Sequence, residues 1–177
     1  MSSQLSLPLF DAGDAEFLVG PQIAEASLLA IEEATDRIWG CFFLASVAVD
    51  HDPQRIVRDL CEALIRAHRR GVDVKLLLDD FESSTDGLPT NEVTGQFLKR
   101  RGVAVRLYKS NRHNSTHSKY ILFDEGSQIV GSGNLTHGGL EANLEMAIQV
   151  DSPDLMRWLG ERFLRNWSSG RDLEDLP

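Results

Sequence analysis

The stretch 117-HSKYILFDEGSQIVGSGN-134 decides how this chain is expected to fold. Its apolar runs at residues 120–123 and 128–130 are separated by Asp-Glu-Gly-Ser, a pattern that predicts a β-hairpin. Because side chains alternate between the faces of a strand, His117 and Lys119 are expected on one side and Asp124 on the other. The hairpin should therefore gather polar groups at one end of a sheet.

Apolar runs alternate with segments of helical periodicity around this hairpin. Further strands are expected at residues 15–19, 39–49, 72–78, 103–109 and 143–150, and helices at 23–38, 53–70, 91–101 and 153–167. Strands joined by helices of this length favour right-handed β-α-β connections. We expect an α/β fold with a mixed, largely parallel central sheet that is flanked by helices on both faces.

Length and composition predict one domain. A chain of 177 residues with 42% hydrophobic content can bury one substantial core. We expect an N-terminal arm or peptide motif at residues 1–13, the folded catalytic domain at 14–168 and a solvated C-terminal tail at 169–177. Cys41 and Cys61 lack metal-ligand spacing and are interpreted as buried thiols in a reducing compartment. No apolar run reaches the roughly 18–20 residues of a membrane span, and the basic start of a secretory signal is missing, so a cytoplasmic protein is expected.

The charge is distributed unevenly along the chain. The formal net charge is -9, yet residues 93–123 contain no Asp or Glu and seven basic residues. The first three of these, at 99–101, are explained by a helix C-terminus, where positive charge is favourable. Arg106, Lys109 and Arg112 continue toward His117, and local attraction of a phosphate-bearing substrate is the better explanation for them.

The residue types around the hairpin suit phosphoryl transfer. A neutral imidazole is a nucleophile or base near pH 7, and the Lys119 ammonium supplies fixed positive charge. The turn formed by Gly131, Ser132, Gly133 and Asn134 can bring backbone N–H groups and an amide close to an anion. Glu145 is a candidate to select the tautomer of His117. The sequence shows neither a carboxylate cluster nor a Cys/His ligand set for a metal-dependent route.

Each part of the motif is uninformative alone, since a His-x-Lys pair is usually structural and a GSGN segment is usually a turn. The combination of His117, Lys119, Asp124, Gly131-Ser132 and Asn134 in one continuous register resembles the HKD motif of the phospholipase D superfamily. The preceding β-α-β layout is also similar to that family over most of the chain. A phospholipase D-like fold is therefore expected.

The resemblance also implies roles for these residues. His117 would attack phosphorus to give a phosphohistidine, while a second histidine acts as general acid and then as base. Lys119 and Asn134 would hold the phosphate oxygens, Ser132 would assist them, and Glu145 would orient His117. Asp124 is a motif letter, but its opposite face predicts a structural residue. No metal and no cofactor is implied.

One copy of the motif supplies only one such histidine. None of the other histidines, His51, His68, His113 and His137, begins a His-x-Lys pair. His51 and His68 are expected at the surface, whereas His113 and His137, like Arg112 and Lys109, are candidates to bind substrate. The simplest completion is an isologous homodimer that joins two half-sites at a two-fold axis. A heterodimer with a related chain is the alternative.

The family resemblance leaves several substrates open. The basic segment and the similarity of the motif end to restriction-type nucleases favour a DNA endonuclease. The alternatives are a lipid phosphodiesterase or phosphatidyl transferase and a noncatalytic nucleic-acid-binding dimer. The segment QLSLPLF, from Gln4 to Phe10, resembles the peptide by which bacterial proteins dock on the sliding clamp. Its alternative is an arm that packs on the domain or on the dimer partner.

Overall fold

The computed structural model describes residues 13–47, 55–80, 90–109 and 115–173 of the chain. Its strands form one eight-stranded sheet in the order β1-β7-β6-β5-β2-β3-β4-β8. The strands are β1 (Ala15–Val19), β2 (Arg37–Phe42), β3 (Asp73–Asp79), β4 (Ala104–Tyr108), β5 (Lys119–Phe123), β6 (Ser127–Gly131), β7 (Met146–Asp151) and β8 (Arg171–Asp172). The helices are α1 (Gln22–Glu33), α2 (Ile56–Arg69), α3 (Thr90–Lys99), the π-helix η1 (Gly138–Ala142) and α4 (Pro153–Ser169).

The mixed α/β class with helices on both faces is confirmed, but the parallel share of the sheet is smaller than expected. Within the described residues, β2 pairs in parallel with β3 and β3 with β4, whereas the other neighbouring strands pair antiparallel. Only these three strands are joined through α2 and α3 as β-α-β units. The hairpin β5-β6 then places β5 antiparallel to β2, a direction that alternating apolar segments do not reveal.

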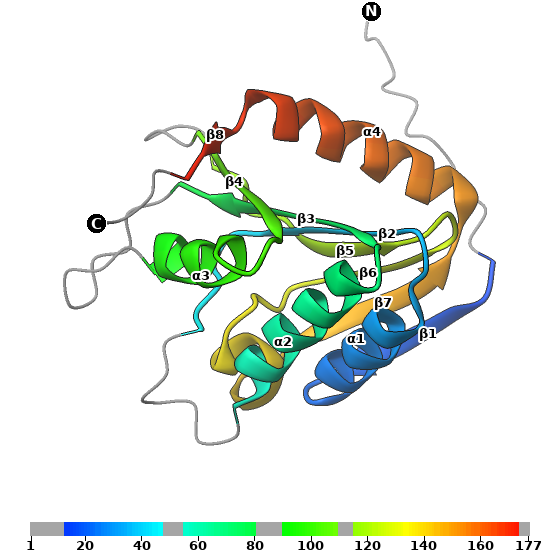
Figure 1. Cartoon of the computed structure of the whole chain (residues 1–177). Coiled ribbons are helices and arrows are strands. Elements are labelled where there is room, and N and C mark those ends of the chain that lie inside the picture. The colour runs from blue at the N-terminus through cyan, green and yellow to red at the C-terminus, as the bar shows by residue number, and fades with distance from the viewer. Residues whose placement is uncertain (1–12, 48–54, 81–89, 110–114, 174–177) are drawn as a thin grey trace, which may run out of the picture.

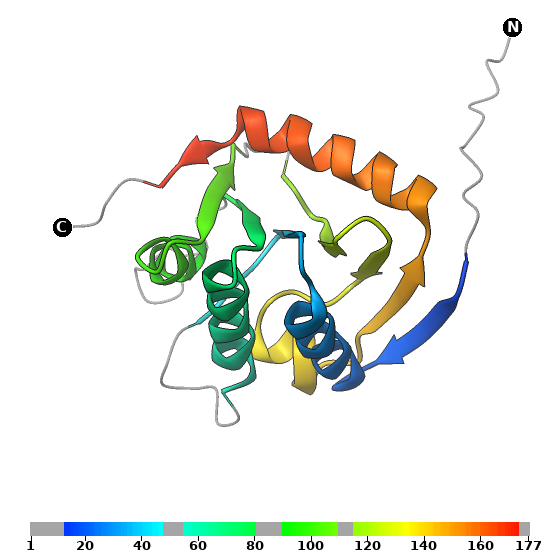
Figure 2. The ribbon, with the colours of Figure 1, turned by 45° about the vertical axis from the view of Figure 1, so that its right-hand side comes forward.

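The two faces of the sheet are covered unequally. Helix α4 crosses one face alone, while α1, α2 and α3 cover the other (Figure 1). Under α4, Trp39 stacks on Phe163 with 5.3 Å between ring centroids. Ser152 caps this helix by accepting a hydrogen bond from the N–H of Leu155 at 3.3 Å, and Pro153 begins its first turn. Figure 2 shows α4 running from the end of β7 across the sheet and away from β1.

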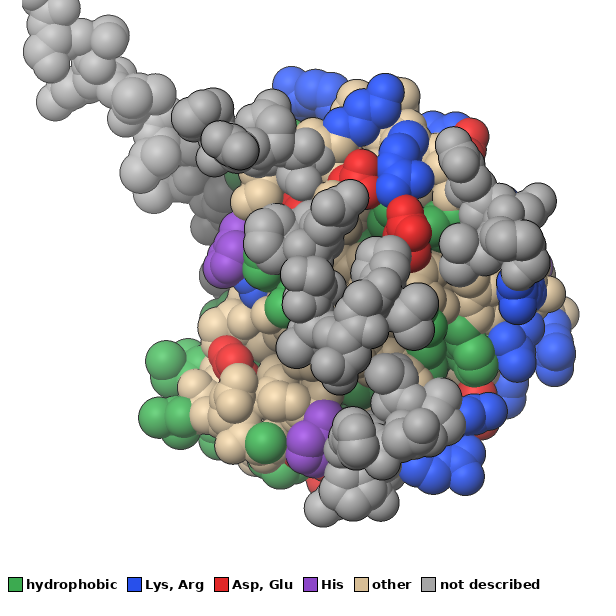
Figure 3. Space-filling model, turned by 90° about the vertical axis from the view of Figure 1, so that its left-hand side faces the viewer, with side chains coloured by type: hydrophobic (Ala, Val, Ile, Leu, Met, Phe, Trp, Pro, Cys, Tyr) green, Lys and Arg blue, Asp and Glu red, His purple; other side chains and the backbone are tan. Residues whose placement is uncertain are grey.

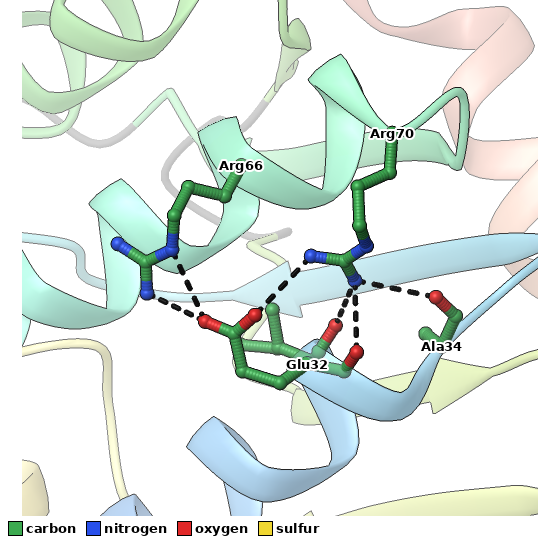
Figure 4. Close-up of polar contacts among 5 residues, drawn as sticks. Glu32, Ala34, Arg66 and Arg70 are labelled. Atoms are coloured by element: carbon green, nitrogen blue, oxygen red, sulfur yellow. Dashed lines mark hydrogen bonds and ion pairs between the residues drawn. The ribbon is translucent and has the colours of Figure 1, made fainter.

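Helix α1 is shorter than the periodicity predicts because tertiary contacts end it at Glu33. Glu32 forms ion pairs with Arg66 of α2 at 2.5 Å and with Arg70, the residue that follows α2, at 3.2 Å (Figure 4). The Arg70 guanidinium also donates to the carbonyls of Ile31 at 2.8 Å and Ala34 at 3.3 Å. Helix C-termini leave carbonyls without partners, and here the side chain of Arg70 supplies the donors.

Residues 171–173, which composition assigns to a solvated tail, pack against the sheet. Strand β8 pairs with β4, and the side chain of Leu173 is buried in the core. Arg171 binds Asp80 at 2.6 Å and Glu92 at 2.6 Å, and thereby ties the segment to the end of β3 and to α3. The partners of Arg171 are about 80 to 90 residues away in sequence, so local composition carries no sign of them.

Cys41 and Cys61 are buried thiols, as expected. Burial raises the pKa of Cys41 to about 11 and that of Cys61 to about 12. In the part of the chain that the structure describes, no helix is both long and apolar enough to cross a membrane.

Candidate active site

The hairpin and β7 bring the motif residues to one end of the sheet. Tyr120 pairs with Val130 and Gly131 pairs with Ala147, so the start of β5, the end of β6 and the start of β7 lie side by side. This end is also where β2 and β3 finish. Figure 3 faces this end and shows histidine side chains on it, with Lys and Arg side chains along the top and the right and apolar side chains at the lower left.

His117 and Lys119 form a direct pair. The Lys119 Nζ lies 2.9 Å from Nδ1 of His117 and donates to the carbonyl of His117 at 2.8 Å. The imidazole is exposed, whereas Lys119 is only 8% exposed. Burial lowers the pKa of Lys119, and the nearby Glu145 and Cys41 offset part of that shift. The expected placement of both residues in one site is what the hairpin geometry produces.

The residue before His117 is held by two buried groups. The N–H of Thr116 donates to a carboxylate oxygen of Asp79 at 2.5 Å. The Thr116 hydroxyl lies 3.3 Å from the Cys41 thiol. Because Asp79 ends β3 and Cys41 belongs to β2, the segment that leads into His117 is attached to both central strands.

The Asn134 amide has a fixed orientation. Its Oδ1 accepts a hydrogen bond from the N–H of Leu44 at 3.1 Å. The NH₂ end of the amide therefore points away from Leu44, and its donors remain suited to an anion. Leu135, the next residue, donates to the carbonyl of Leu44 at 3.0 Å and secures the same segment.

Ser132 and Glu145 form a second polar pair beside the first. The Ser132 hydroxyl donates to the Glu145 carboxylate and accepts from the N–H of Met146 at 3.2 Å. Asn143 donates to the other Glu145 oxygen at 3.4 Å. Among the described residues, the carboxylate thus hydrogen-bonds to Ser132 and Asn143. The role of Glu145 in orienting His117 stays a prediction.

Gly131 and Gly133 are required by packing. A Cβ on Gly131 would lie 2.6 Å from the Cβ of Ala147, and one on Gly133 would lie 2.4 Å from the carbonyl oxygen of Gly139. The N–H of Ser132 between them is bonded to the carbonyl of Met146 at 3.0 Å. These two glycines therefore allow their backbone to lie close to β7 and to η1.

Asp124 lies at the far end of β5 from His117. Its carboxylate accepts hydrogen bonds from the N–H groups of Thr35, Asp36 and Arg37, at 2.8 to 3.2 Å, and so fixes the start of β2. Burial alone would raise the pKa of Asp124, but the hydrogen bonds from Asp36, Arg37 and Thr35 outweigh it and hold that pKa below its usual range. This position fits the structural role expected of the residue.

Two residues of the basic segment have structural partners, and one of them, Arg106, was expected to attract substrate. Arg106 binds Asp172 at 2.9 Å and the carbonyl of Trp167 at 2.9 Å, so its side chain secures β8 and α4. Lys99 donates to the carbonyl of Leu173 at 2.7 Å. These partners lie near the C-terminus, and sequence proximity to His117 does not predict them. Lys109 is exposed just after β4 and remains a candidate for substrate binding.

The remaining candidates divide into two groups. His137 precedes η1, and its Nδ1 lies 3.4 Å from Oε2 of Glu141 in that helix. The imidazole is therefore close to a carboxylate only four residues away. Arg112, His113 and the segment from Gln4 to Phe10 lie outside the described residues.

One residue of the site was missed by sequence reasoning. The Phe43 ring lies 4.6 Å from the His117 ring, centroid to centroid, with 41° between their planes. The Lys119 Nζ lies 5.3 Å from the centroid of the same ring. Phe43 sits in the apolar run WGCFFLASVAV, where it reads as one more strand residue. Its place beside His117 depends on the antiparallel pairing of β2 with β5.

The assembled groups are chemically coherent. An exposed imidazole, a buried ammonium and an oriented amide share one end of the sheet, and each can act on a tetrahedral anion. The described residues contain no cluster of three or more His, Cys, Asp or Glu side chains that could hold a metal ion.

The chain is similar to known cardiolipin hydrolases and phospholipases D. A mitochondrial cardiolipin hydrolase of Chlamydomonas reinhardtii is 26% identical over 109 residues, which cover 62% of this chain and 46% of the relative. A phospholipase D of Rickettsia bellii is 32% identical over 107 residues, 60% of this chain and 48% of the relative. The chain spans about half the length of these curated relatives.

The fold agrees with the sequence comparison. The crystal structure of the phospholipase D family member Nuc from Salmonella typhimurium superimposes with a TM-score of 0.73 at 24% identity, covering 92% of this chain and all 100% of that one. The family model of the cardiolipin synthase, PLD-like domain matches residues 28–167, which include every described residue of the site from Phe43 to Glu145. The chain therefore belongs to the phospholipase D superfamily, whose PLD-like domain model spans most of its length.

Proposed function

We propose that this protein is a metal-independent endonuclease that cleaves DNA phosphodiester bonds through a phosphohistidine intermediate in a homodimeric active site. The observation that carries the proposal is the convergence of His117, Lys119 and Asn134 at one exposed end of the sheet. Such a set supplies a nucleophile, a fixed positive charge and an amide donor for one phosphate group.

The proposed reaction has two displacements. A ring nitrogen of His117 attacks phosphorus, and the P–O bond to the leaving alcohol breaks as His117 of the partner subunit gives that oxygen a proton. Water then attacks the phosphohistidine, the same partner histidine takes its proton, and the P–N bond breaks to release the phosphate product. Lys119 and Asn134 stabilise the phosphate oxygens in both steps, where negative charge is concentrated.

The homodimer is proposed because one chain supplies half of this set. The sheet next to the half-site also leaves apolar side chains exposed. Phe17 pairs with Ile148 and Val19 with Met146 in the register of β1 and β7, and all four side chains are exposed on the strands that α4 leaves uncovered (Figure 2). Exposed apolar clusters of this kind are typical of protein interaction surfaces.

DNA is the favoured substrate because the chain concentrates basic residues near the motif. Residues 93–123 carry positive charge and no carboxylate, and Lys109 of this segment is exposed. A lipid phosphodiester is the second candidate. It is favoured by the similarity to a cardiolipin hydrolase and by the exposed apolar cluster, which is suited to contact with acyl chains as well as with a protein.

A substrate panel separates the two candidates. The purified protein is incubated, in the presence of a chelator, with single-stranded DNA, double-stranded DNA, RNA and phosphatidyl lipid vesicles. His117→Ala should abolish cleavage and retain DNA binding, whereas His68→Ala on α2 is the matched histidine control and should cleave normally. Cleavage of lipid alone would refute the DNA assignment, and an absolute need for added metal would refute the mechanism.

The dimer has its own test. Sedimentation should give a dimer, and Ile148→Asp in the apolar cluster should shift it toward monomer and lower cleavage together. A monomer that cleaves at full rate would contradict the shared site. Loss of vesicle binding in Ile148→Asp without a change of mass would instead favour the lipid candidate.

A further inference from the structure

The two residues that follow β2 contact every member of the proposed phosphate-binding set. The Phe43 ring lies against His117 and beneath the Lys119 ammonium, at centroid distances of 4.6 and 5.3 Å. The N–H of Leu44 orients the Asn134 amide at 3.1 Å. These contacts come from a single short segment, although the residues that they reach are spread over 18 positions of the motif stretch.

The segment is itself held in place by a buried side chain of α3. Asn91 is 2% exposed and makes three hydrogen bonds: its amide donates to the carbonyls of Phe43 at 2.8 Å and Asp79 at 2.7 Å, and its Oδ1 accepts from the N–H of Ala45 at 2.8 Å. One side chain thus ties the end of β2 to the end of β3. A buried amide with all these bonds made is a rigid support, because breaking any of them leaves a buried polar group without a partner.

We propose that Phe43 is a positioning residue of the active site, which holds the His117 ring and the Lys119 ammonium in register for attack on phosphorus. The inference rests on the proposed phosphodiesterase function of the site. A tilted ring pair at this distance is attractive, and an aromatic face attracts an ammonium that lies over it. Phe43 and Lys119 therefore both contact the His117 ring, one through its aromatic face and the other through its ammonium.

The physical consequence concerns rate more than binding. Phe43 offers the substrate no charge and no hydrogen-bond donor, so its loss should leave ground-state affinity almost unchanged. A nucleophile that is free to rotate reacts more slowly, because displacement by about 1 Å can cost on the order of 10²-fold in rate. The signature of a positioning residue is therefore a fall in kcat at nearly constant KM.

The test compares variants at Phe43 with a matched aromatic elsewhere. Phe43→Leu removes the ring and Phe43→Tyr keeps it. Phe97→Leu, on α3, is the control. Phe97 is also half-buried, and the cations of Arg58 and Arg101 lie over its ring. Cleavage is measured with a small activated phosphodiester as well as with DNA, so that the result does not depend on the DNA assignment. Chemical shifts of the His117 ring protons provide a readout that needs no substrate.

Phe43→Leu is expected to lower kcat by roughly 10- to 100-fold and to keep KM within about 3-fold of the parent value. Phe43→Tyr and Phe97→Leu should keep both kcat and KM within about 3-fold of the parent values. The His117 ring protons should lose their ring-current shift in Phe43→Leu and keep it in Phe43→Tyr. An unchanged kcat in Phe43→Leu, an effect on KM alone, or equal losses in the leucine and tyrosine variants would overturn the proposal. Phe43→Met serves if the leucine variant does not fold, and failure of both ringless variants to fold would make Phe43 a structural residue.

If the parent protein cleaves neither substrate, the proposed function fails while the ring-current comparison still decides whether Phe43 holds His117. The two failures are thereby distinguishable.

Discussion

Replacement of Asp124 should cost stability and leave the chemistry intact. Its carboxylate accepts hydrogen bonds from three consecutive backbone N–H groups, the closest at 2.8 Å from Asp36. A hydrogen bond to a charged group contributes about 1.5–3 kcal/mol, but three that share one half-exposed carboxylate are not additive. Asp124 also has a φ of 49°, a left-handed conformation that Asn tolerates and Ala does not.

These terms give different magnitudes for two variants. Asp124→Asn keeps the backbone conformation and one acceptor oxygen, so we expect a loss of about 1–2 kcal/mol in the free energy of unfolding. Asp124→Ala loses all three hydrogen bonds and adds about 1 kcal/mol of backbone strain, which gives roughly 2–4 kcal/mol. For about 3 kcal/mol, a domain of this size should lose on the order of 6–12 °C in Tm.

The assay combines urea unfolding with cleavage by folded protein, and Glu125→Ala, at the exposed neighbouring residue, is the control. The folded-state pKa of Asp124 lies below its ordinary 3.8, so the stability that the carboxylate contributes is present above that pH and is lost as pH falls through the folded pKa. The difference in stability between the parent and Asp124→Asn should therefore shrink below about pH 4. A large fall in kcat with unchanged stability would refute the structural interpretation and make Asp124 part of the chemistry.

Three other changes test the site and its support. The folded-state pKa of Lys119 lies below 10.5, so the alkaline fall in kcat/KM should occur at lower pH than for an exposed lysine, and Lys119→Arg should move that fall to higher pH in a pH–rate profile. Gly133→Ala places a Cβ 2.4 Å from the carbonyl oxygen of Gly139 and should cost about 1–3 kcal/mol in urea unfolding; a variant of unchanged stability would contradict the close packing. Arg171→Ala should lower the free energy of unfolding by about 1–2 kcal/mol, because the half-buried carboxylates of Asp80 and Glu92 lose their partner. Arg157→Ala, which breaks an exposed ion pair, is the control and should change it little. Equal losses in the two variants would show that the ion pairs of Arg171 add no stability.

The sequence was most informative where the signal is local. The hairpin is confirmed because its two apolar runs and its turn lie within one short stretch. Lys119 begins β5 and Asp124 follows its last residue, so the two side chains lie at opposite ends of the strand. The helices are confirmed with shifted ends. Helix α1 ends before residue 38 because Asp124 and Arg70, both distant in sequence, hold the following residues.

What could not be predicted depends on pairings between distant segments. The run at residues 39–49 reads as one long strand, but β2 ends at Phe42 because Asn91 and Thr94 of α3 take over the backbone groups of Ala45 and Val47. Composition does not distinguish a ladder hydrogen bond from one made by a helix side chain. For the same reason, Phe43 could be recognised as part of the site only once the neighbours of β2 were known.

The short strand β8 has a consequence for handling the protein. It covers the side of β4 that would otherwise present unpaired N–H and C=O groups, and a bare sheet edge is a template for pairing with other chains. Shortening the chain before Arg171 should therefore promote aggregation in addition to lowering stability. A purification tag attached directly after Leu173 could weaken the pairing of the two-residue strand β8 with β4. A tag separated from Leu173 by a flexible spacer is therefore the better design.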